Sequence, residues 1–184
     1  MAGAFATAAA AITGVVVLVQ RDTMPVPAGP ISLERQIAAA VPFTADPDLE
    51  FHARFSPDEK RIVFIKRDES RSQLIVQEVA SRNRVVVASS EATLASPVFF
   101  PDGRHIAYYR RDADGEDCGI FSRALAESRP TRLVECSGSL RTLFDLSADG
   151  NFLAFAASLR PQMPSAIQLL DLRSGAIAAL TAPQ

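Results

Sequence analysis

Apolar residues occur along most of this chain in short runs, and one such run follows the same kind of turn three times. Residues 55–64 read FSPDEKRIVF, residues 99–108 read FFPDGRHIAY, and residues 146–155 read LSADGNFLAF. The copies recur at intervals of about 45 residues, a repeat length typical of β-propeller blades. The pattern therefore predicts an all-β repeat protein.

The residues after each turn are apolar at three adjacent positions. Ile62, Ile106 and Leu153 align, and each is followed by a small residue and then an aromatic one. An alternating strand would place a polar residue at every second position, so three apolar neighbours predict an inner strand that is buried on both faces. Blades stacked face to face around an axis bury strands in this way.

The turn residues themselves repeat. Proline presets φ, aspartate bonds the local backbone and glycine accepts a left-handed conformation, so we interpret the turn residues as structural. They are Ser56, Pro57, Asp58, Pro101, Asp102, Gly103, Ser147, Asp149 and Gly150. The first copy has Glu59 where the others have glycine, which predicts strain of about 1 kcal/mol if Glu59 adopts a positive φ.

Further strands complete a four-stranded unit in each copy. Third strands are predicted at residues 74–79, 120–125 and 167–172, and fourth strands at residues 84–88, 132–136 and 176–181. The turn at residues 172–176 contains Gly175, which fits a bulged three-residue loop. We expect a partial β-propeller of about three four-stranded blades, at about 43–90, 91–138 and 139–182.

Three blades do not close a ring, since propellers usually have four to eight. An open stack leaves two apolar blade faces uncovered and favours association. Either the natural chain is longer, or several copies close a ring together, or the gene is a remnant. We favour an incomplete propeller, and we expect the part from residue 23 to residue 184 to self-associate or to be partly molten.

The first twenty residues carry no charge. In a helix they would span roughly 30 Å, the thickness of a bilayer core, so we predict one N-terminal transmembrane helix at residues 1–20. A cleaved signal peptide and a buried or mis-assigned start are the alternatives. No basic residue precedes Arg21 and no good cleavage site follows the apolar run, which disfavours the signal peptide. Arg21 and Arg35 lie after the segment, so the positive-inside rule alone would keep the blades in the cytoplasm. An additional domain upstream would remove that objection.

Residues 21–42 form a linker and lead-in segment. Four residues of the stretch 23–30 are proline or glycine, which predicts an extended, semi-rigid spacer. Residues 31–41 are compatible with a short helix or with an outer strand.

Composition narrows the function. The net charge is −2 and no basic run occurs, so nucleic acid is not an expected partner. With two cysteines and two histidines, a Cys/His metal site is disfavoured, and we expect neither a metal nor a cofactor.

Cys118 and Cys136 would face each other across one hairpin if residues 126–128 form its loop. A cross-strand disulfide then fits the reach of the bridge. The alternative is two separate small apolar side chains, because a one-residue bulge would break the register.

Other chemistry-bearing residues have structural interpretations. Residues 111–117 cluster four carboxylates, but their spacing does not match an EF-hand, and a solvated hairpin tip is favoured over a calcium site. His52 and His105 lie beside blade strands without a nucleophile at a recognisable elbow, so we predict no enzymatic activity. Residues 137–139, Ser-Gly-Ser, are too short for a phosphate cradle.

These repeats resemble those of the TolB-type propeller family. The stretch 43–50 running into residues 53–58 further resembles the periplasmic propeller region of membrane-anchored, CadC-like winged-helix transcriptional regulators. The resemblance covers residues 43–181, and the winged helix of that family is absent here.

The resemblance implies a single-pass inner-membrane protein whose propeller lies in the periplasm and binds a protein or small ligand, without contacting nucleic acid itself. The implied role is the sensory part of a CadC-like regulator. Two alternatives remain: a TolB-like cell-envelope interaction module, and the propeller fragment of a prolyl-oligopeptidase-like hydrolase.

Overall fold

The structure is a computed structural model that describes residues 41–44, 46–136, 140–158 and 165–181. Contacts divide the chain into residues 1–43 and 44–184, and every described strand lies in the second unit. The predicted membrane helix at residues 1–20 and most of the linker lie outside the described residues. Within the described ranges, no helix has the length and apolarity needed to cross a bilayer.

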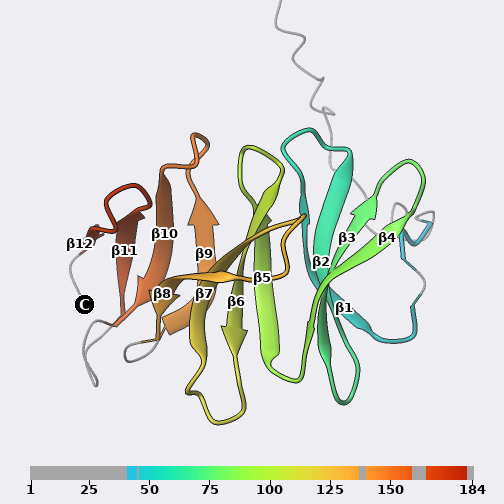
Figure 1. The fold of residues 1–184 in the computed structure, drawn as a ribbon, viewed down its shortest axis with the longest axis horizontal. Helices are drawn as coiled ribbons and strands as arrows, with labels where there is room; N and C mark the ends of the chain where they lie inside the picture. Colours follow the sequence, from blue (N-terminus) through green and yellow to red (C-terminus); the bar gives the residue numbers. More distant parts are fainter. Residues whose placement is uncertain (1–40, 45, 137–139, 159–164, 182–184) are drawn as a thin grey trace, which may run out of the picture. The chain divides into compact units, whose positions relative to one another are not determined.

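Twelve described strands form three separate antiparallel sheets of four strands each (Figure 1). Blade 1 has the order β1-β2-β3-β4, at Leu49–Phe55, Arg61–Arg67, Ser72–Glu78 and Arg84–Ser90. Blade 2 has the order β5-β6-β7-β8, at Thr93–Phe99, His105–Arg111, Cys118–Ala124 and Thr131–Glu135. Blade 3 has the order β9-β10-β11-β12, at Leu140–Leu146, Phe152–Ala157, Ala166–Asp171 and Ile177–Ala179.

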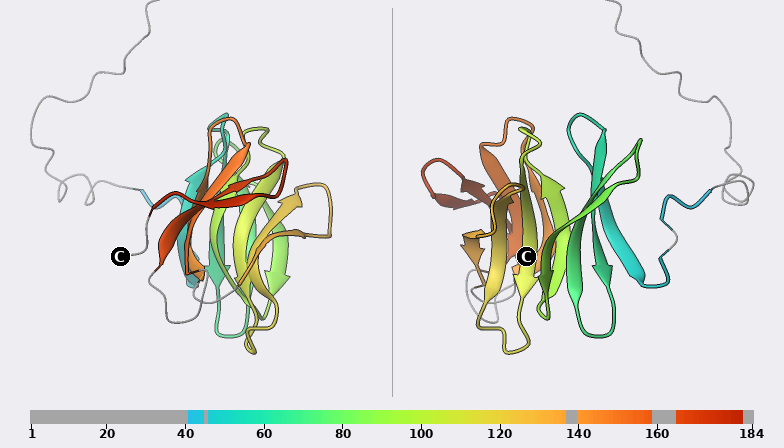
Figure 2. Two further views of the ribbon diagram at one scale, coloured as in Figure 1. Left: turned by 90° about the vertical axis from the view of Figure 1, so that its left-hand side faces the viewer. Right: turned by 45° about the vertical axis from the view of Figure 1, so that its right-hand side comes forward.

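The sheets follow one another in chain order (Figures 1 and 2). The first strands β1, β5 and β9 approach one another, since β5 contacts both β1 and β9. We call the face of each blade that is directed toward the preceding blade its leading face, and the opposite face its trailing face.

One apolar core lies between blades 1 and 2. The trailing face of blade 1 and the leading face of blade 2 supply its buried side chains, which are Val63, Ile65, Leu74, Val76, Val87, Leu94, Phe99, Ile106, Tyr108 and Phe121. A second core lies between blades 2 and 3, and its buried side chains are Ala107, Ile120, Val134, Leu153, Phe155, Ala157 and Leu170. Each interface therefore buries one face of each of the two sheets that meet there.

The strand after each turn is buried on both faces in blades 1 and 2 but not in blade 3. Residues 62–65 of β2 and 106–109 of β6 are all buried. Strand β10 instead alternates, because Ala154 and Ala156 point away from blade 2 and are only half-buried. The expectation of a strand buried on both faces is wrong for blade 3, since no described sheet covers its trailing face.

Candidate functional site

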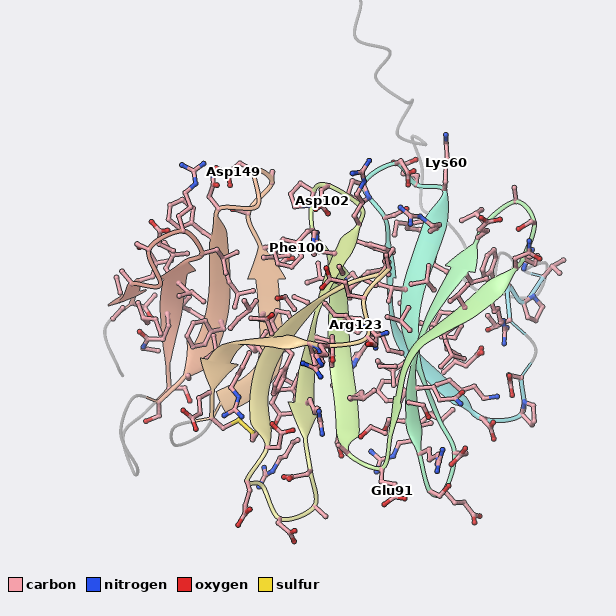
Figure 3. All side chains as sticks on the ribbon, viewed as in Figure 1. Lys60, Glu91, Phe100, Asp102, Arg123 and Asp149 are labelled. Carbon is pink, nitrogen blue, oxygen red and sulfur yellow. A yellow bond between two sulfur atoms is a disulfide. The ribbon has the colours of Figure 1, made fainter. Side chains whose placement is uncertain are left out.

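The turns between the first and second strands of all three blades gather at one end of the propeller unit. In Figure 3, Lys60, Asp102 and Asp149 mark these turns along the upper edge, and Glu91 marks the opposite end. Each turn is closed by the same hydrogen bond, from the backbone N–H of Ser56, Phe100 or Ser147 to the carbonyl oxygen five residues later, at 2.8–2.9 Å. The repeated sequence thus builds a repeated surface.

The aspartate of each turn is held by its own turn. Asp58 Oδ1 accepts hydrogen bonds from the Ser56 hydroxyl at 2.6 Å and the Lys60 amide at 3.2 Å. The hydrogen bond from Ser56, followed by that from Lys60, lowers the pKa of Asp58 below its ordinary value. The carboxylate therefore stays ionised and caps the turn.

Asp149 is held more tightly. Its carboxylate accepts hydrogen bonds from the Ser147 hydroxyl at 2.5 Å, from the Asn151 amide N–H at 3.0 Å and from Asn151 Nδ2 at 2.6 Å. The Ser147 contact is the largest cause that lowers the pKa of Asp149, to about 2.

Asp102 has a histidine as its partner. Burial raises the pKa of Asp102, but hydrogen bonds from the Arg104 amide and the His105 ring outweigh burial and lower the pKa overall. His105 Nδ1 lies 2.5 Å from Asp102 Oδ2. This contact joins His105 to its own turn.

Successive turns touch one another. A Cβ placed on Gly103 would lie 3.1 Å from Arg61 and 3.9 Å from Pro57, and one placed on Gly150 would lie 3.0 Å from Pro101. Both glycines have positive φ, 63° and 70°. The repeated glycine therefore serves two purposes: it supplies a left-handed φ and leaves room for the proline of the preceding blade.

Between these turns lies an apolar depression of about 290 Å³ to which all three blades contribute. Its lining residues are Pro57, Val98, Phe99, Pro101, Asp145, Leu146, Ser147 and Ala148. We call this feature the turn-end depression. Sequence reasoning assigned the prolines to the turns but missed the depression, because its shape depends on how the blades are placed beside one another.

Two other hollows lie nearby. One of about 570 Å³ is open and is formed by residues 58–61 and 78–80 of blade 1 alone. The other, of about 390 Å³, lies between the outer strands of blade 1 and the β7–β8 loop, where it is lined by Val85, Val87 and Leu125 among others.

His52 lies on the first strand of blade 1. Its Nδ1 accepts a hydrogen bond of 3.1 Å from the Ser96 amide of blade 2. His52 and Ser96 occupy equivalent positions, at the bulges of β1 and β5, with φ of 57° and 49°. The imidazole thus bridges two blades, a contact that the sequence did not predict.

Asp117 belongs to residues 111–117, the acidic stretch for which the sequence favours a solvated hairpin tip over a calcium site. Its carboxylate pairs with Arg110 at 2.9 Å and with Arg132 at 3.4 Å. The backbone closes the hairpin tip through Gly115, which has a φ of 77° and donates to the Asp112 carbonyl. Among the described residues, no group of three or more His, Cys, Asp or Glu side chains is placed to hold a metal ion.

Cys118 and Cys136 are joined by a disulfide, with their Cα atoms 5.3 Å apart. The cross-strand register explains the pairing. Ile120 lies opposite Val134 and Gly119 opposite Glu135, so the next pair outward is the two cysteines. A bulge lies between Ile120 and Phe121, yet the register beyond it still brings the cysteines together. Residues 137–139, which follow this strand, lie outside the described residues.

Comparisons with known proteins bear on the fold. No family model and no curated protein matches the sequence. Similar solved structures include a TolB-type protein from Agrobacterium tumefaciens, which is 19% identical with a TM-score of 0.61; the match covers 74% of this chain and 50% of that one. A puromycin-hydrolysing peptidase from Mycobacterium tuberculosis is 16% identical with a TM-score of 0.59, over 77% of this chain and 23% of that one.

A prolyl endopeptidase is 21% identical with a TM-score of 0.57, over 75% of this chain and 23% of that one. The chain thus spans half the length of the TolB-type structure and about a quarter of the two peptidases. At these identities the likeness establishes the fold, a TolB-like β-propeller, and leaves activity and partners to be argued from the chain's own residues.

Proposed function

We propose that this chain is a non-enzymatic protein-interaction module: a β-propeller held at the inner membrane by residues 1–20, with its blades in the periplasm. The observation that carries the proposal is the turn-end depression, where all three blades present apolar side chains at one end of the unit. Within this end the carboxylates of Asp58 and Asp149 are already engaged by their own turns. What remains for a partner is mainly apolar surface.

The size of the depression favours side chains of a protein over a free small molecule. Pockets for drug-sized ligands have volumes of about 300–1,000 Å³, and about 290 Å³ lies just below that range. A depression of this volume fits one or two apolar side chains, the usual anchors of a protein interface. We therefore expect a partner that inserts an aliphatic or aromatic residue between Pro57, Pro101 and Leu146.

By the resemblance of residues 43–58 to CadC-like regulators, we further propose that binding at this end serves a sensory role in transcriptional control. The alternative is a TolB-like envelope protein that works by protein contact alone. The two differ at the N-terminus: an uncleaved anchor at residues 1–20 favours the regulator, and a cleaved signal favours the envelope protein.

Site-specific photocrosslinking in membranes of the native host tests the proposal. A photoreactive residue at Ala148, which is exposed at the depression, should give an adduct with a distinct protein that Leu146→Asp abolishes. The same residue at Ala113, in the exposed hairpin tip of blade 2, serves as the matched control. Equal labelling at both positions would rule out the turn-end depression as the binding surface.

A topology reporter fused after Gln184 tests the compartment. Alkaline phosphatase is active only in the periplasm, so this fusion should be active. If the orientation is reversed, the phosphatase fusion should be inactive, and a fluorescent protein that folds only in the cytoplasm should fluoresce at the same position. N-terminal sequencing of the purified protein then determines whether residues 1–20 are retained.

A further inference from the structure

Two blade faces lack a neighbouring blade among the described residues: the leading face of blade 1 and the trailing face of blade 3. Phe55 and Phe99 show the consequence at equivalent positions. Phe99 is 5% exposed because blade 1 packs against it, whereas Phe55, on the leading face of blade 1, is 65% exposed. Val86 on the same face is 51% exposed.

The trailing face of blade 3 is mostly apolar, with two carboxylates on it: Asp145 lies beside Ala154 on β9, and Asp171 lies beside Phe152 on β11. The strand register places Ala154 beside Leu169 and Ala156 beside Ile167, and the Leu180 amide bonds the Ile167 carbonyl. Ile167 and Leu180 are 38% and 64% exposed. In blade 2 the positions of Ala154 and Ala156 hold Ala107 and Tyr109, which the next blade buries almost completely.

The turns of the two end blades differ from the repeat in complementary ways. Where blades meet inside the chain, a proline of one turn contacts a glycine of the next: Pro57 faces Gly103, and Pro101 faces Gly150. Blade 3 has Ala148 in place of the proline, and blade 1 has Glu59 in place of the glycine. Even a Cβ at Gly150 would lie 3.0 Å from Pro101. Glu59, which is bulkier, therefore needs a residue smaller than proline opposite it. Ala148 of a second copy is such a residue.

The aromatic residues at the two ends are complementary as well. Inside the chain, the Arg61 guanidinium lies 5.5 Å from the centre of the Phe99 ring of the next blade. Blade 3 has Phe152 at the position of Arg61. Stacking a blade 1 against blade 3 would therefore bring Phe152 beside Phe55 and bury both rings.

Charged groups cross the leading face of blade 1, and a second sheet would have to pack beside them. Asp46 pairs with Lys66 on β2 at 2.7 Å and with Arg84 on β4 at 3.3 Å, and Arg84 lies over the Phe64 ring. In blade 2, Arg110 occupies the position of Lys66, pairs with Asp117 and lies over the Phe121 ring, yet blade 2 packs closely on blade 1.

The centre of the leading face of blade 1 already has little exposed surface. Ile62, Phe64 and Ile75 are 2–9% exposed there. The surface that a second sheet would newly bury thus lies at Phe55 and Val86 on this face, and across the trailing face of blade 3.

We propose that two copies of this chain associate head to tail, with blade 3 of each copy packing against blade 1 of the other. The contact repeats a blade–blade interface that the chain already forms twice. Two such contacts join the three described blades of one copy to those of the other and close a ring of six, within the four to eight blades that propellers use. Ala148 belongs to both surfaces, but the pairing does not require that the turn-end depression bind another protein.

Analytical ultracentrifugation of the full chain in mild detergent tests the proposal. We expect a dimer of the 19.8 kDa chain, and Phe55→Asp and Ile167→Asp should each weaken dimerisation at least tenfold. Val85→Asp is the matched control, because Val85 is 63% exposed on blade 1 but points to the opposite face of the sheet. It should leave the dimer intact.

Mixing the two variants gives the sharper test. A head-to-tail pair of one Phe55→Asp chain and one Ile167→Asp chain retains one interface with both faces unmodified, so the mixture should dimerise more strongly than either variant alone. A wild-type chain that stays monomeric at about 100 μM, or a mixture that shows no such rescue, would overturn the proposal.

Discussion

The guanidinium of Arg61 in blade 1 donates a hydrogen bond of 2.8 Å to the carbonyl oxygen of Gly103 in the turn of blade 2. The same guanidinium lies over the Phe99 ring. One side chain therefore connects the turn and the core of the next blade, and it does so at the end where the turn-end depression lies.

Replacing Arg61 with alanine should destabilise the protein by about 1–2 kcal/mol, because a charge-assisted hydrogen bond and a cation–π contact are lost together. Urea unfolding followed by circular dichroism measures the change. Lys60→Ala, one residue earlier and exposed, is the control and should have almost no effect. Equal losses for the two variants would contradict a specific role for Arg61.

Glu59 has a φ of 58°, in the left-handed region that side chains other than glycine adopt at a cost. Glu59→Gly removes this strain but gives the unfolded chain more conformational freedom. The net effect should be to raise the unfolding free energy of the monomer by about 0.5–1 kcal/mol. Gly103→Ala should do the reverse, because its φ is 63° and its Cβ would crowd Arg61 at 3.1 Å. Thermal unfolding of both variants beside the wild type tests the opposite signs.

The fold was predictable from the sequence because the turn and the strand after it recur together. The third strands predicted at 74–79 and 120–125 lie at Ser72–Glu78 and Cys118–Ala124, a shift of one or two residues. Such shifts arise because apolar periodicity locates the centre of a strand better than its ends. The sequence predicts strain at Glu59 if this residue has a positive φ, and in the structure it does.

What the sequence did not reveal depends on contacts between blades. The turn-end depression joins Pro57, Val98 and Leu146, one residue from each blade, which are distant along the chain. The hydrogen bond from Ser96 to His52 likewise crosses between blades at two bulges, and a bulge leaves no clear mark in the apolar pattern. Periodicity reports which face is buried, but not what lies opposite that face.

Asp149 should make the third turn sensitive to acid. Its pKa is about 2 in the folded protein, below the ordinary value of 3.8 that the unfolded chain retains. A lowered folded pKa means that the carboxylate stabilises the fold above about pH 4, and that this contribution is lost as the pH falls toward 2. Carboxyl-carbon NMR titration should give a midpoint near 2.

Ser147→Ala removes the largest cause of that shift, so the Asp149 midpoint should rise toward 3.8. Ser70→Ala, which removes a hydrogen bond to Asp68 in blade 1, is the control and should leave Asp149 unchanged. A wild-type midpoint near 3.8 would show that the Ser147 and Asn151 contacts do not form in solution.

The Cys118–Cys136 disulfide should contribute substantially to stability, because it closes a loop with a sequence separation of 18 residues. In the chain-entropy account, a loop of this size is worth about 3 kcal/mol. The double variant Cys118→Ala/Cys136→Ala should lose about that amount in urea unfolding, and reduced wild type should match it. Intact-mass measurement after alkylation without reductant should find no free thiol, whereas two alkylated cysteines would contradict the bridge.

Gly119 lies inside strand β7, where the neighbouring backbone leaves no room for a side chain. A Cβ at this position would lie 2.2 Å from the Val134 carbonyl oxygen, far closer than van der Waals contact allows, and a backbone atom in a paired strand cannot move aside easily. Gly119→Ala should therefore force β7 and β8 apart and cost about 3 kcal/mol. Gly175→Ala is the informative control: its φ is 73°, but no atom lies within 4 Å of the added Cβ, so it should cost only about 1 kcal/mol. If Gly119→Ala costs no more than Gly175→Ala, the tight β7–β8 pairing that positions the cysteines would be wrong.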